Sequence, residues 1–403
     1  MKNIAIIGAG ASGLMIAVRL KNNKQFNITI FDKNLAVGKK LLVTGNGRCN
    51  VTNLCSPSQF LEYVPHNSKF LFSAINNFTP NDMVEFLHDN NQEVIVVENN
   101  RVFPTSNKAE SIRAMFESLV CSADNITLKL NTNVDAIKYS NNTLSLLVGG
   151  KTQTFDAVVV ATGGLSYPKT GSTGDGIAFA SALNLPLTVA RPALCGIKLK
   201  NKHLVLSGNS YNVKLQLCAS KVTGNMLFTH FGVSGPAVFE LTSRLQQNSI
   251  KDSELIVDFM PDKTTDELNK MFRQYYLDNS KKMLKSCVAN FVGEKLAKII
   301  LHYCNLDETI KVANISTKQT NQIINAIKNY NLQVLDFEDI EHATITRGGV
   351  DVNCINSKTM ESKLIPNLYF VGEVLDVDGL SGGFNLQIAF STAVACADAI
   401  VKR

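Results

Sequence analysis

The sequence predicts an α/β fold in which a doubly wound parallel sheet is interrupted by an insert. Three observations predict it: a strand–helix–strand pattern with a glycine-rich turn opens the chain, strands and then helices fill the stretch after residue 188, and glycine-rich strand and turn sequences return near residue 345. Together they predict a discontinuous domain formed by 1–188 plus 345–403, a β-rich insert at 189–262 and a helical insert at 263–344.

The first element is a βαβ unit. "KNIAIIGAG" indicates a buried parallel strand that ends in glycine, "ASGLMIAVRLKN" has helical spacing, and "ITIFDK" indicates a second buried strand. Three such elements in about 30 residues require a right-handed crossover in a parallel sheet. The same stretch superficially resembles a signal peptide, but the glycine spacing and the strand that follows favour a retained folded segment.

The later elements follow from pattern and turn signals. The segments "ITLKLN", "VDAIKYS", "TLSLLV" and "TQTFDAVVV" predict an antiparallel meander that leads into a buried strand at 158–160. Within the insert, "YNVKLQLCA" alternates like a strand, and Thr264 with Glu267 forms a capping box that starts a helix. We expect a helix after Gly382 and Gly383 at the end of the chain.

Composition narrows the class of protein. The 403 residues are 45% hydrophobic and 18% charged, as in soluble globular proteins, and no run reaches the roughly 18 uncharged apolar residues of a membrane helix. Nine cysteines show no C-x-x-C spacing, so we expect no metal site, reduced thiols and a cytoplasmic location.

Charge is unevenly distributed. Residues 189–330 hold 19 Lys+Arg against 11 Asp+Glu, whereas the whole chain has a net charge of +6. One interpretation is a lysine-rich solvated helical surface, and the other is an electrostatic footprint for a polyanion.

A dinucleotide site is predicted at the first turn. The sequence from Gly8 to Gly13 fits G-x-G-x-x-G between a strand and a helix, and Asp32 follows Gly13 by nineteen positions. In this motif the glycines allow a tight turn, close approach of a pyrophosphate and helix packing, and the acid binds a ribose. The residues that we expect to contact the dinucleotide here are Gly8, Gly10, Ala11, Ser12, Gly13 and Asp32.

Three further segments favour FAD over NAD as sole dinucleotide. A helix that starts at Gly382 and Gly383 directs its positive end at an electron-rich group, which suits the N1 and O2 edge of a reduced flavin. We expect cofactor contacts from the loop "LLVTGNGRCN" and its neighbour, from "VVVATGG", and from the C-terminal "GEVLDVDGLSGGFN". The residues are Lys40, Gly45, Asn46, Arg48 and Asn50, then Ala161, Thr162, Gly163 and Gly164, then Gly372, Glu373, Asp376, Gly382, Gly383 and Asn385.

The motifs resemble those of a known family. "GAGASGLM", "GKKLLVTGNGRCNVTN", "ATGGLSYPKTGSTGDG", "FTHFGVSGPAV", "TRGGV", "TMESK" and "LYFVGEVLDVDGLSGGFNLQIA" occur in this order along nearly the whole chain. The chain is therefore similar to the HI0933-like family of FAD-dependent flavoproteins. The resemblance implies a glutathione-reductase-like FAD domain, interrupted by a small β-barrel-like part and a helical part. Asp32 departs from the family pattern, in which many members have Glu.

The resemblance also implies a reaction class. Activities within the family include reduction of a carbon–carbon double bond in steroid-like enones and dihydrouridine synthesis in ribosomal RNA, such as 23S rRNA. Both add a hydride from flavin N5 to an activated C=C bond, after which a general acid protonates the neighbouring carbon.

Three side chains are candidates for that acid. Cys49 has Arg48 beside it, which would lower a thiol pKa, His230 is a histidine in "FTHFGVSGP", and Tyr167 is a phenol in "GLSYPKTG". The alternatives are a packing cysteine in a cofactor-lining loop, a structural histidine in the insert and a structural tyrosine.

The sequence leaves the substrate open. No second G-x-G-x-x-G is present, so we expect NAD(P)H as electron donor to dock transiently rather than in a Rossmann site. The three hypotheses are a reductase of a small-molecule alkene, an enzyme that modifies ribosomal RNA through its basic insert, and a redox-sensing flavoprotein without substrate. None of them involves a membrane.

Overall fold

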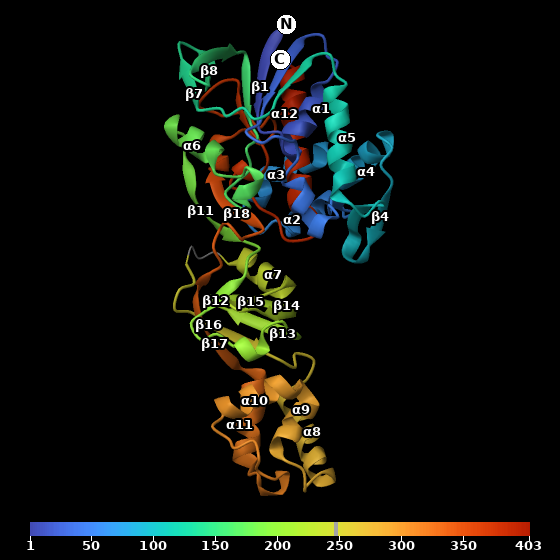
Figure 1. Cartoon of the computed structure of the whole chain (residues 1–403), viewed down its shortest axis with the longest axis vertical. Coiled ribbons are helices and arrows are strands. Elements are labelled where there is room, and N and C mark those ends of the chain that lie inside the picture. Colours follow the sequence, from blue (N-terminus) through green and yellow to red (C-terminus); the bar gives the residue numbers. More distant parts are fainter. Residues whose placement is uncertain (246–248) are drawn as a thin grey trace. The chain divides into compact units, whose positions relative to one another are not determined.

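The chain forms two compact units. The computed structural model describes residues 1–245 and 249–403. The first unit comprises Met1–Ala193 and Asp339–Arg403, and the second comprises Leu194–Glu338 (Figure 1). The boundaries lie a few residues from the positions 188/189 and 344/345 that sequence patterns suggested.

A five-stranded parallel sheet forms the centre of the first unit. Its strand order is β19-β10-β1-β2-β6, and every neighbouring pair is parallel. The strands are β1 (Lys2–Ile7), β2 (Phe26–Phe31), β6 (Ile126–Lys129), β10 (Ala157–Val160) and β19 (Leu368–Phe370). Because the order reverses between β1 and β10, the carboxyl ends of these two strands form the position at which open α/β sheets bind ligands.

One strand lies elsewhere than its pattern predicted. β6, the "ITLK" segment, was expected in the antiparallel meander, but it is the parallel edge strand beside β2, with Ile28 opposite Ile126. Its alternating pattern suits either role, because an edge strand exposes one face. The meander itself consists of β7 (Ala136–Ser140), β8 (Thr143–Val148) and β9 (Lys151–Phe155).

Helices and two small sheets complete the first unit. α1 (Ala11–Leu20) makes the first crossover, and α12 (Phe384–Val401) packs against it. The remaining helices are α2 (Pro57–Glu62), α3 (Ser68–Asn77), α4 (Pro80–Asp89), α5 (Ala109–Cys121) and α6 (Asp175–Ala182). The small sheets are β3 (Thr52–Asn53), β5 (Arg101–Pro104) and β4 (Val94–Val97), and the antiparallel pair β11 (Leu187–Ala193) and β18 (Ile345–Val350).

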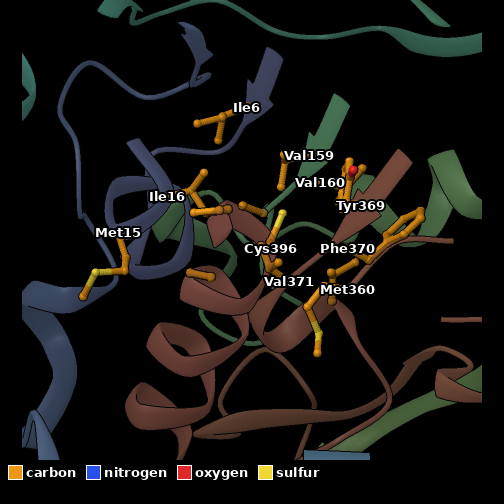
Figure 2. Packing of buried hydrophobic residues seen from close by; sticks show 14 of the residues in the cluster. Ile6, Met15, Ile16, Val159, Val160, Met360, Tyr369, Phe370, Val371 and Cys396 are labelled. Carbon is orange, nitrogen blue, oxygen red and sulfur yellow. The ribbon is translucent and has the colours of Figure 1, made fainter. Parts of the chain in front are cut away.

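The core lies around the central strands and helices α1 and α12. Ile6, Ile16, Val159 and Cys396 are among the fully buried side chains that meet there (Figure 2). In the part of the chain that the structure describes, α12 is the one helix long and apolar enough to span a membrane. Of its 18 residues, 72% are buried inside the protein.

The second unit contains a closed six-stranded antiparallel barrel. Its order is β12 (Ile197–Leu199), β15 (Gly232–Ser234), β14 (Ser220–Phe228), β13 (Ser210–Leu217), β16 (Glu254–Asp258) and β17 (Tyr330–Phe337). α7 (Pro236–Arg244) packs on β14. The helical part comprises α8 (Thr265–Asp278), α9 (Leu284–Val292), α10 (Glu294–Tyr303) and α11 (Thr317–Lys328).

The barrel uses a strand from the segment that was expected to be helical. β17 comes from the last part of 263–344, and it closes the barrel by pairing with both β16 and β12. Its sequence "YNLQVLDF" alternates buried and less buried residues along most of its length, as a strand requires. The predicted capping box is present: Thr264 Oγ1 accepts from Glu267 N at 3.2 Å, and Glu267 Oε2 accepts from Thr264 N at 2.7 Å.

Candidate cofactor site

The first turn has the geometry of a phosphate-binding turn. A Cβ atom at Gly8 would lie 2.5 Å from Ala161 O, and one at Gly13 would lie 1.9 Å from Gly8 O, so packing requires both glycines. A Cβ at Gly10 would meet nothing within 4 Å. Gly10 is also the N-cap of α1 and has no side-chain cap, so unpaired N–H groups of the helix face open space. The turn therefore fits a pyrophosphate.

Asp32 lies at the carboxyl end of β2 and is tied to the same turn. Its Oδ2 accepts a hydrogen bond from Ala9 N at 2.7 Å, and its Oδ1 accepts from Asn34 N at 2.7 Å. Gly38 N donates to Ala9 O at 2.8 Å, which brings the start of the next loop to the turn. Asn34 Nδ2 also donates to Oδ1, at 2.9 Å, so three of the roughly four acceptor positions of this carboxylate are used and one remains for a ribose hydroxyl.

The loop at 41–50 is shaped by left-handed residues. Gly45 and Asn46 both have φ of +56°, and Asn46 and Arg48 are exposed. The Arg48 guanidinium lies 4.7 Å from the centroid of the Phe103 ring. Asn50 Oδ1 is buried and has no hydrogen-bond partner among the described residues. An unpaired buried acceptor costs about 1–3 kcal/mol, so a donor from a bound ligand fits here.

Lys40 and Glu373 form the centre of a polar network. Lys40 Nζ lies 2.7 Å from both Glu373 Oε2 and Ser166 Oγ, and Ser166 donates to Glu373 Oε1 at 3.0 Å. Thr346 N also donates to Glu373 Oε1, at 2.9 Å. The network joins the loop after β10 to the 3₁₀ turn Gly372–Val374. Thr162 Oγ1, in the same loop after β10, is buried and unpaired among the described residues.

Gly382 and Gly383 precede α12, as predicted. Gly383 is the N-cap of α12 with φ of +98°, and no side chain caps this helix. A Cβ at Gly383 would lie 2.4 Å from Thr52 O, so glycine is required for contact with β3. Asn385, which was expected to contact the cofactor, has its amide paired with Gly379: Oδ1 accepts from Gly379 N at 2.9 Å, and Nδ2 donates to Gly379 O at 2.7 Å. Its side chain therefore holds the preceding turn.

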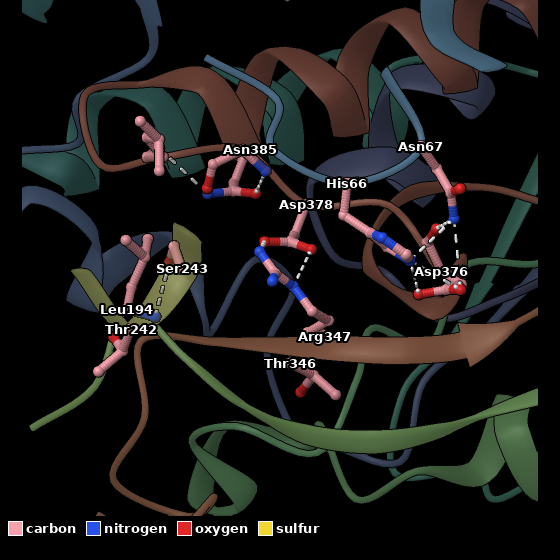
Figure 3. A network of polar contacts seen from close by, with 12 residues as sticks. His66, Asn67, Leu194, Thr242, Ser243, Thr346, Arg347, Asp376, Asp378 and Asn385 are labelled. Atoms are coloured by element: carbon pink, nitrogen blue, oxygen red, sulfur yellow. Dashed lines mark hydrogen bonds and ion pairs between the residues drawn. The ribbon is translucent and has the colours of Figure 1, made fainter. Parts of the chain in front are cut away.

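Asp376 belongs to a network that sequence patterns missed. Its Oδ2 lies 3.1 Å from His66 Nε2, and Asn67 Nδ2 donates to Asp376 O at 2.6 Å (Figure 3). Burial raises the pKa of Asp376, but hydrogen bonds, chiefly that of His66, outweigh it, so the pKa is lowered and the carboxyl stays ionised. His66 stands alone in the sequence, 310 residues from its partner, and no motif signals it.

A buried ion pair lies beside this network. Arg347 Nε donates to Asp378 Oδ1 at 2.7 Å, and its Nη2 donates to Oδ2 at 2.6 Å. The two side chains are 4% and 2% exposed. His66 and Asp378 form an isolated β-bridge, so the segment that contains Asp376 and Asp378 runs beside His66. The ion pair and the His66–Asp376 contact therefore lie close together (Figure 3).

The three predicted acid candidates lie in different environments. Cys49 is fully buried in the core of the first unit, and burial raises its pKa to about 11, against the effect of a hydrogen bond with Thr44. Tyr167 is 36% exposed, and its ring centroid is 6.0 Å from Lys40 Nζ. His230 is exposed in the turn between β14 and β15 of the second unit, with its ring against Phe231.

The parallel sheet, the glycine turn and the converging C-terminal helix define a Rossmann-type protein that binds FAD. The family model described as the HI0933-like protein Rossmann domain matches residues 2–399. The chain belongs to this HI0933-like family of FAD-dependent oxidoreductases.

Curated relatives resemble the chain over its whole length. A ribosomal RNA dihydrouridine synthase from Haemophilus influenzae is 32% identical, with 99% of this chain and 98% of the relative covered. The protein of the same name from Escherichia coli is 30% identical, with 98% and 97% covered. A 3-dehydro-bile acid delta(4,6)-reductase from Clostridium scindens is 26% identical, with both chains covered fully.

Solved structures share the fold. A 3-ketosteroid delta1-dehydrogenase from Sterolibacterium denitrificans matches with a TM-score of 0.53 and 12% identity, and all of both chains is covered. A quinol fumarate reductase from Escherichia coli matches with a TM-score of 0.51 and 14% identity, with all of this chain and 70% of the other covered.

Proposed function

We propose that the protein is a cytoplasmic, FAD-dependent reductase of an activated C=C bond and that its substrate is uridine in ribosomal RNA. One observation carries the choice of substrate: the two relatives named for this activity are at least 30% identical over nearly their whole lengths. The C5=C6 bond of uridine is conjugated to a carbonyl group, as is the double bond of an enone. The same hydride addition therefore serves both substrate classes of the family.

Residues of the first unit would hold FAD in a glutathione-reductase-like, doubly wound domain. The N-terminus of α1 at Gly10 suits the pyrophosphate, Asp32 suits the ribose, and the uncapped N-terminus of α12 suits an electron-rich ring edge. Bound FAD supplies the hydride, and NAD(P)H is the proposed source of its electrons. Asn50 Oδ1 and Thr162 Oγ1 are the buried acceptors that a ligand would satisfy.

The chain itself must deliver a proton to the carbon next to the one that receives the hydride. Cys49 is enclosed and holds its proton tightly, so the packing interpretation suits it better. His66 and Tyr167 are both partly exposed in the first unit. We favour His66, because Asp376 Oδ2 lies 3.1 Å from its Nε2 and fixes the orientation of the ring, and Tyr167 is the second candidate.

The second unit has a net positive charge, which attracts polyanions such as RNA. Its residues 194–338 hold 18 Lys+Arg against 13 Asp+Glu, a net of +5. Several of these cations are exposed on the helical part, namely Lys281, Lys282, Lys295, Lys298, Lys311 and Lys318. Contacts with phosphates would make RNA binding fall steeply as salt concentration rises.

The experiment that tests the proposal is mass spectrometry of ribosomal RNA from a strain that lacks the gene. We expect one dihydrouridine to disappear and to return when the gene is restored. An unchanged RNA profile would favour the alternative, a small-molecule enone reductase, which the bile acid reductase relative supports. If the protein reduces neither ribosomal RNA nor a small-molecule enone, the remaining hypothesis is a redox-sensing flavoprotein without a substrate.

A further inference from the structure

The second unit contains a cavity that the proposed chemistry does not use. Its volume is about 270 Å³, and it is lined by Asn201, His203, Tyr303, Tyr330, Asn331 and Gln333. These residues come from the segment after β12, the end of α10 and the start of β17. The backbone fixes two of these segments together, because Lys200 N donates to Gln333 O at 3.0 Å.

Aromatic rings form part of the cavity wall. The Tyr303 and Tyr330 ring centroids are 4.7 Å apart, and the His203 ring meets Tyr330 edge to face at 5.9 Å. Tyr330 is 3% exposed, whereas Tyr303 is 48% exposed. Burial lowers the pKa of His203, so its ring is neutral at neutral pH. The cavity therefore presents uncharged flat surfaces, of which the Tyr303 ring is accessible.

Three side-chain amides supply donors and acceptors beside these rings. Gln333 Nε2 donates to Glu254 Oε1 at 3.0 Å. Asn331 Oδ1 is buried and has no hydrogen-bond partner within the described residues 1–245 and 249–403. An acceptor in this state is satisfied when a ligand donates an N–H group. Amides beside aromatic rings are the groups that recognise the edge and the face of an unstacked nucleobase.

Cations flank the same segment. Lys200 and Lys202 stand on either side of Asn201 in the sequence, and Lys202 is exposed. Lys200 Nζ lies 2.7 Å from Asp252 Oδ1 at the surface. Lys202 is therefore available for a phosphate next to a bound base.

We propose that this cavity binds an unstacked nucleobase of single-stranded RNA, with the Tyr303 ring as the stacking surface and Asn331 Oδ1 as an acceptor for a base N–H. The proposal rests on the proposed RNA substrate and names a contact through which the second unit would hold it. Stacking contributes affinity that salt does not screen, so this contact differs from those of the lysines.

The test measures binding of a fluorescein-labelled oligouridylate to the full-length, FAD-loaded protein across a range of salt concentrations. We expect Tyr303→Ala to weaken binding about ten-fold at every salt concentration without changing the salt slope. Tyr303→Phe should bind like the unaltered protein, Asn331→Ala should weaken binding, and Lys202→Met should lower the salt slope by about one. The matched control is Leu335→Ala, which truncates a 43% exposed side chain on β17, the strand that also carries Asn331.

Three results would overturn the inference. One is oligouridylate binding by Tyr303→Ala within about two-fold of the unaltered protein. The second is an equal loss for Leu335→Ala, which would indicate a general effect on the barrel. The third is a raised KM for NAD(P)H in Tyr303→Ala with unchanged oligouridylate binding, because the occupant would then be the adenine of the electron donor.

A separate assay of dihydrouridine formation distinguishes failure of this inference from failure of the proposed function. If the unaltered protein binds oligouridylate through Tyr303 but forms no dihydrouridine in ribosomal RNA, the base site stands and the proposed function fails. If dihydrouridine forms and Tyr303→Ala changes neither binding nor product, the function stands and the base site is overturned.

Discussion

Lys40 Nζ and Glu373 Oε2 lie 2.7 Å apart and connect two motifs that are 333 residues apart in the sequence. Both residues come from segments that sequence patterns assigned to the cofactor. Ser166, two residues after a third such segment, bonds to both of them. Through Ser166, the ion pair thus connects three neighbouring segments that we expect to contact FAD, and it links the N-terminal and C-terminal parts of the first unit.

Loss of this pair is expected to weaken both the fold and cofactor binding. Lys40→Met leaves the Glu373 carboxylate without its cation at a site where both side chains are less than a quarter exposed. We expect a loss of about 1–3 kcal/mol in the free energy of unfolding and about ten-fold weaker FAD binding. Urea unfolding and fluorescence titration with FAD measure these effects. Lys39→Met, at the exposed neighbouring position, is the control and should change neither.

Two glycine substitutions separate packing from cofactor binding. Gly10→Ala places a methyl group in open space at an ordinary backbone conformation, so we expect the apoprotein to lose no more than about 1 kcal/mol of stability. FAD binding should nevertheless fall, because the methyl group occupies the approach of the pyrophosphate. Gly13→Ala should prevent folding, because its Cβ would lie 1.9 Å from Gly8 O. If Gly10→Ala binds FAD normally, the phosphate assignment at this turn is wrong.

The Arg347–Asp378 pair is expected to be the more costly of two ion pairs to break. Arg347→Met leaves the carboxylate of Asp378 buried without its bidentate partner, so we expect a loss of about 3–5 kcal/mol in the free energy of unfolding. Arg19→Met breaks the exposed pair with Asp398 and should cost no more than about 1 kcal/mol. If chemical denaturation gives the same loss of unfolding free energy for Arg347→Met and Arg19→Met, burial does not determine the cost of breaking these ion pairs.

Cys49 gives a pH-dependent prediction. Burial raises its pKa from 9.0 to about 11 in the folded protein, so the folded state holds this proton more tightly than the unfolded state. The resulting stability is complete below about pH 9 and is lost as the pH rises through about 11, at roughly 1.4 kcal/mol per unit of pKa shift. Cys49→Ala should therefore reduce the decline in unfolding free energy over this range. Cys121→Ala, at an exposed cysteine, should leave the decline as it is.

The acid assignment is tested by separating the two half-reactions. His66→Gln should leave reduction of bound FAD by NAD(P)H unchanged and slow its reoxidation by substrate about 100-fold, the smaller end of general-acid effects. Stopped-flow absorbance follows both steps. If Tyr167→Phe slows reoxidation and His66→Gln does not, the phenol is the donor. If neither variant slows it, both assignments are wrong.

The sequence predicted best those features that residues close together in the chain determine through backbone geometry. The spacing of Gly8, Gly10 and Gly13 predicts their roles, and in the structure a Cβ would clash at Gly8 and Gly13 but meet nothing within 4 Å at Gly10. Strands followed by helices in the insert were also predicted, because alternation and caps signal these elements locally, whereas the barrel was expected only from the family resemblance.

Features that depend on tertiary contacts could not be predicted from the sequence. Asn385 is in a cofactor motif, but its amide pairs with Gly379, a choice that only the folded turn determines. The contact between His66 and Asp376 joins residues 310 positions apart, and the aromatic cavity gathers Tyr303 and Asn331 from separate elements. β17 closes a barrel whose other strands all precede α8 in the sequence, so its pattern alone did not identify it as the closing strand.

The proposed function is tested most directly by a reaction between the FAD-loaded protein, NAD(P)H and ribosomal RNA from a strain that lacks this activity, followed by mass spectrometry of the digested RNA. We predict that one uridine gains two hydrogen atoms and that the gain depends on both FAD and NAD(P)H. An RNA that remains unchanged while the same preparation reduces a steroid enone would contradict the proposed function.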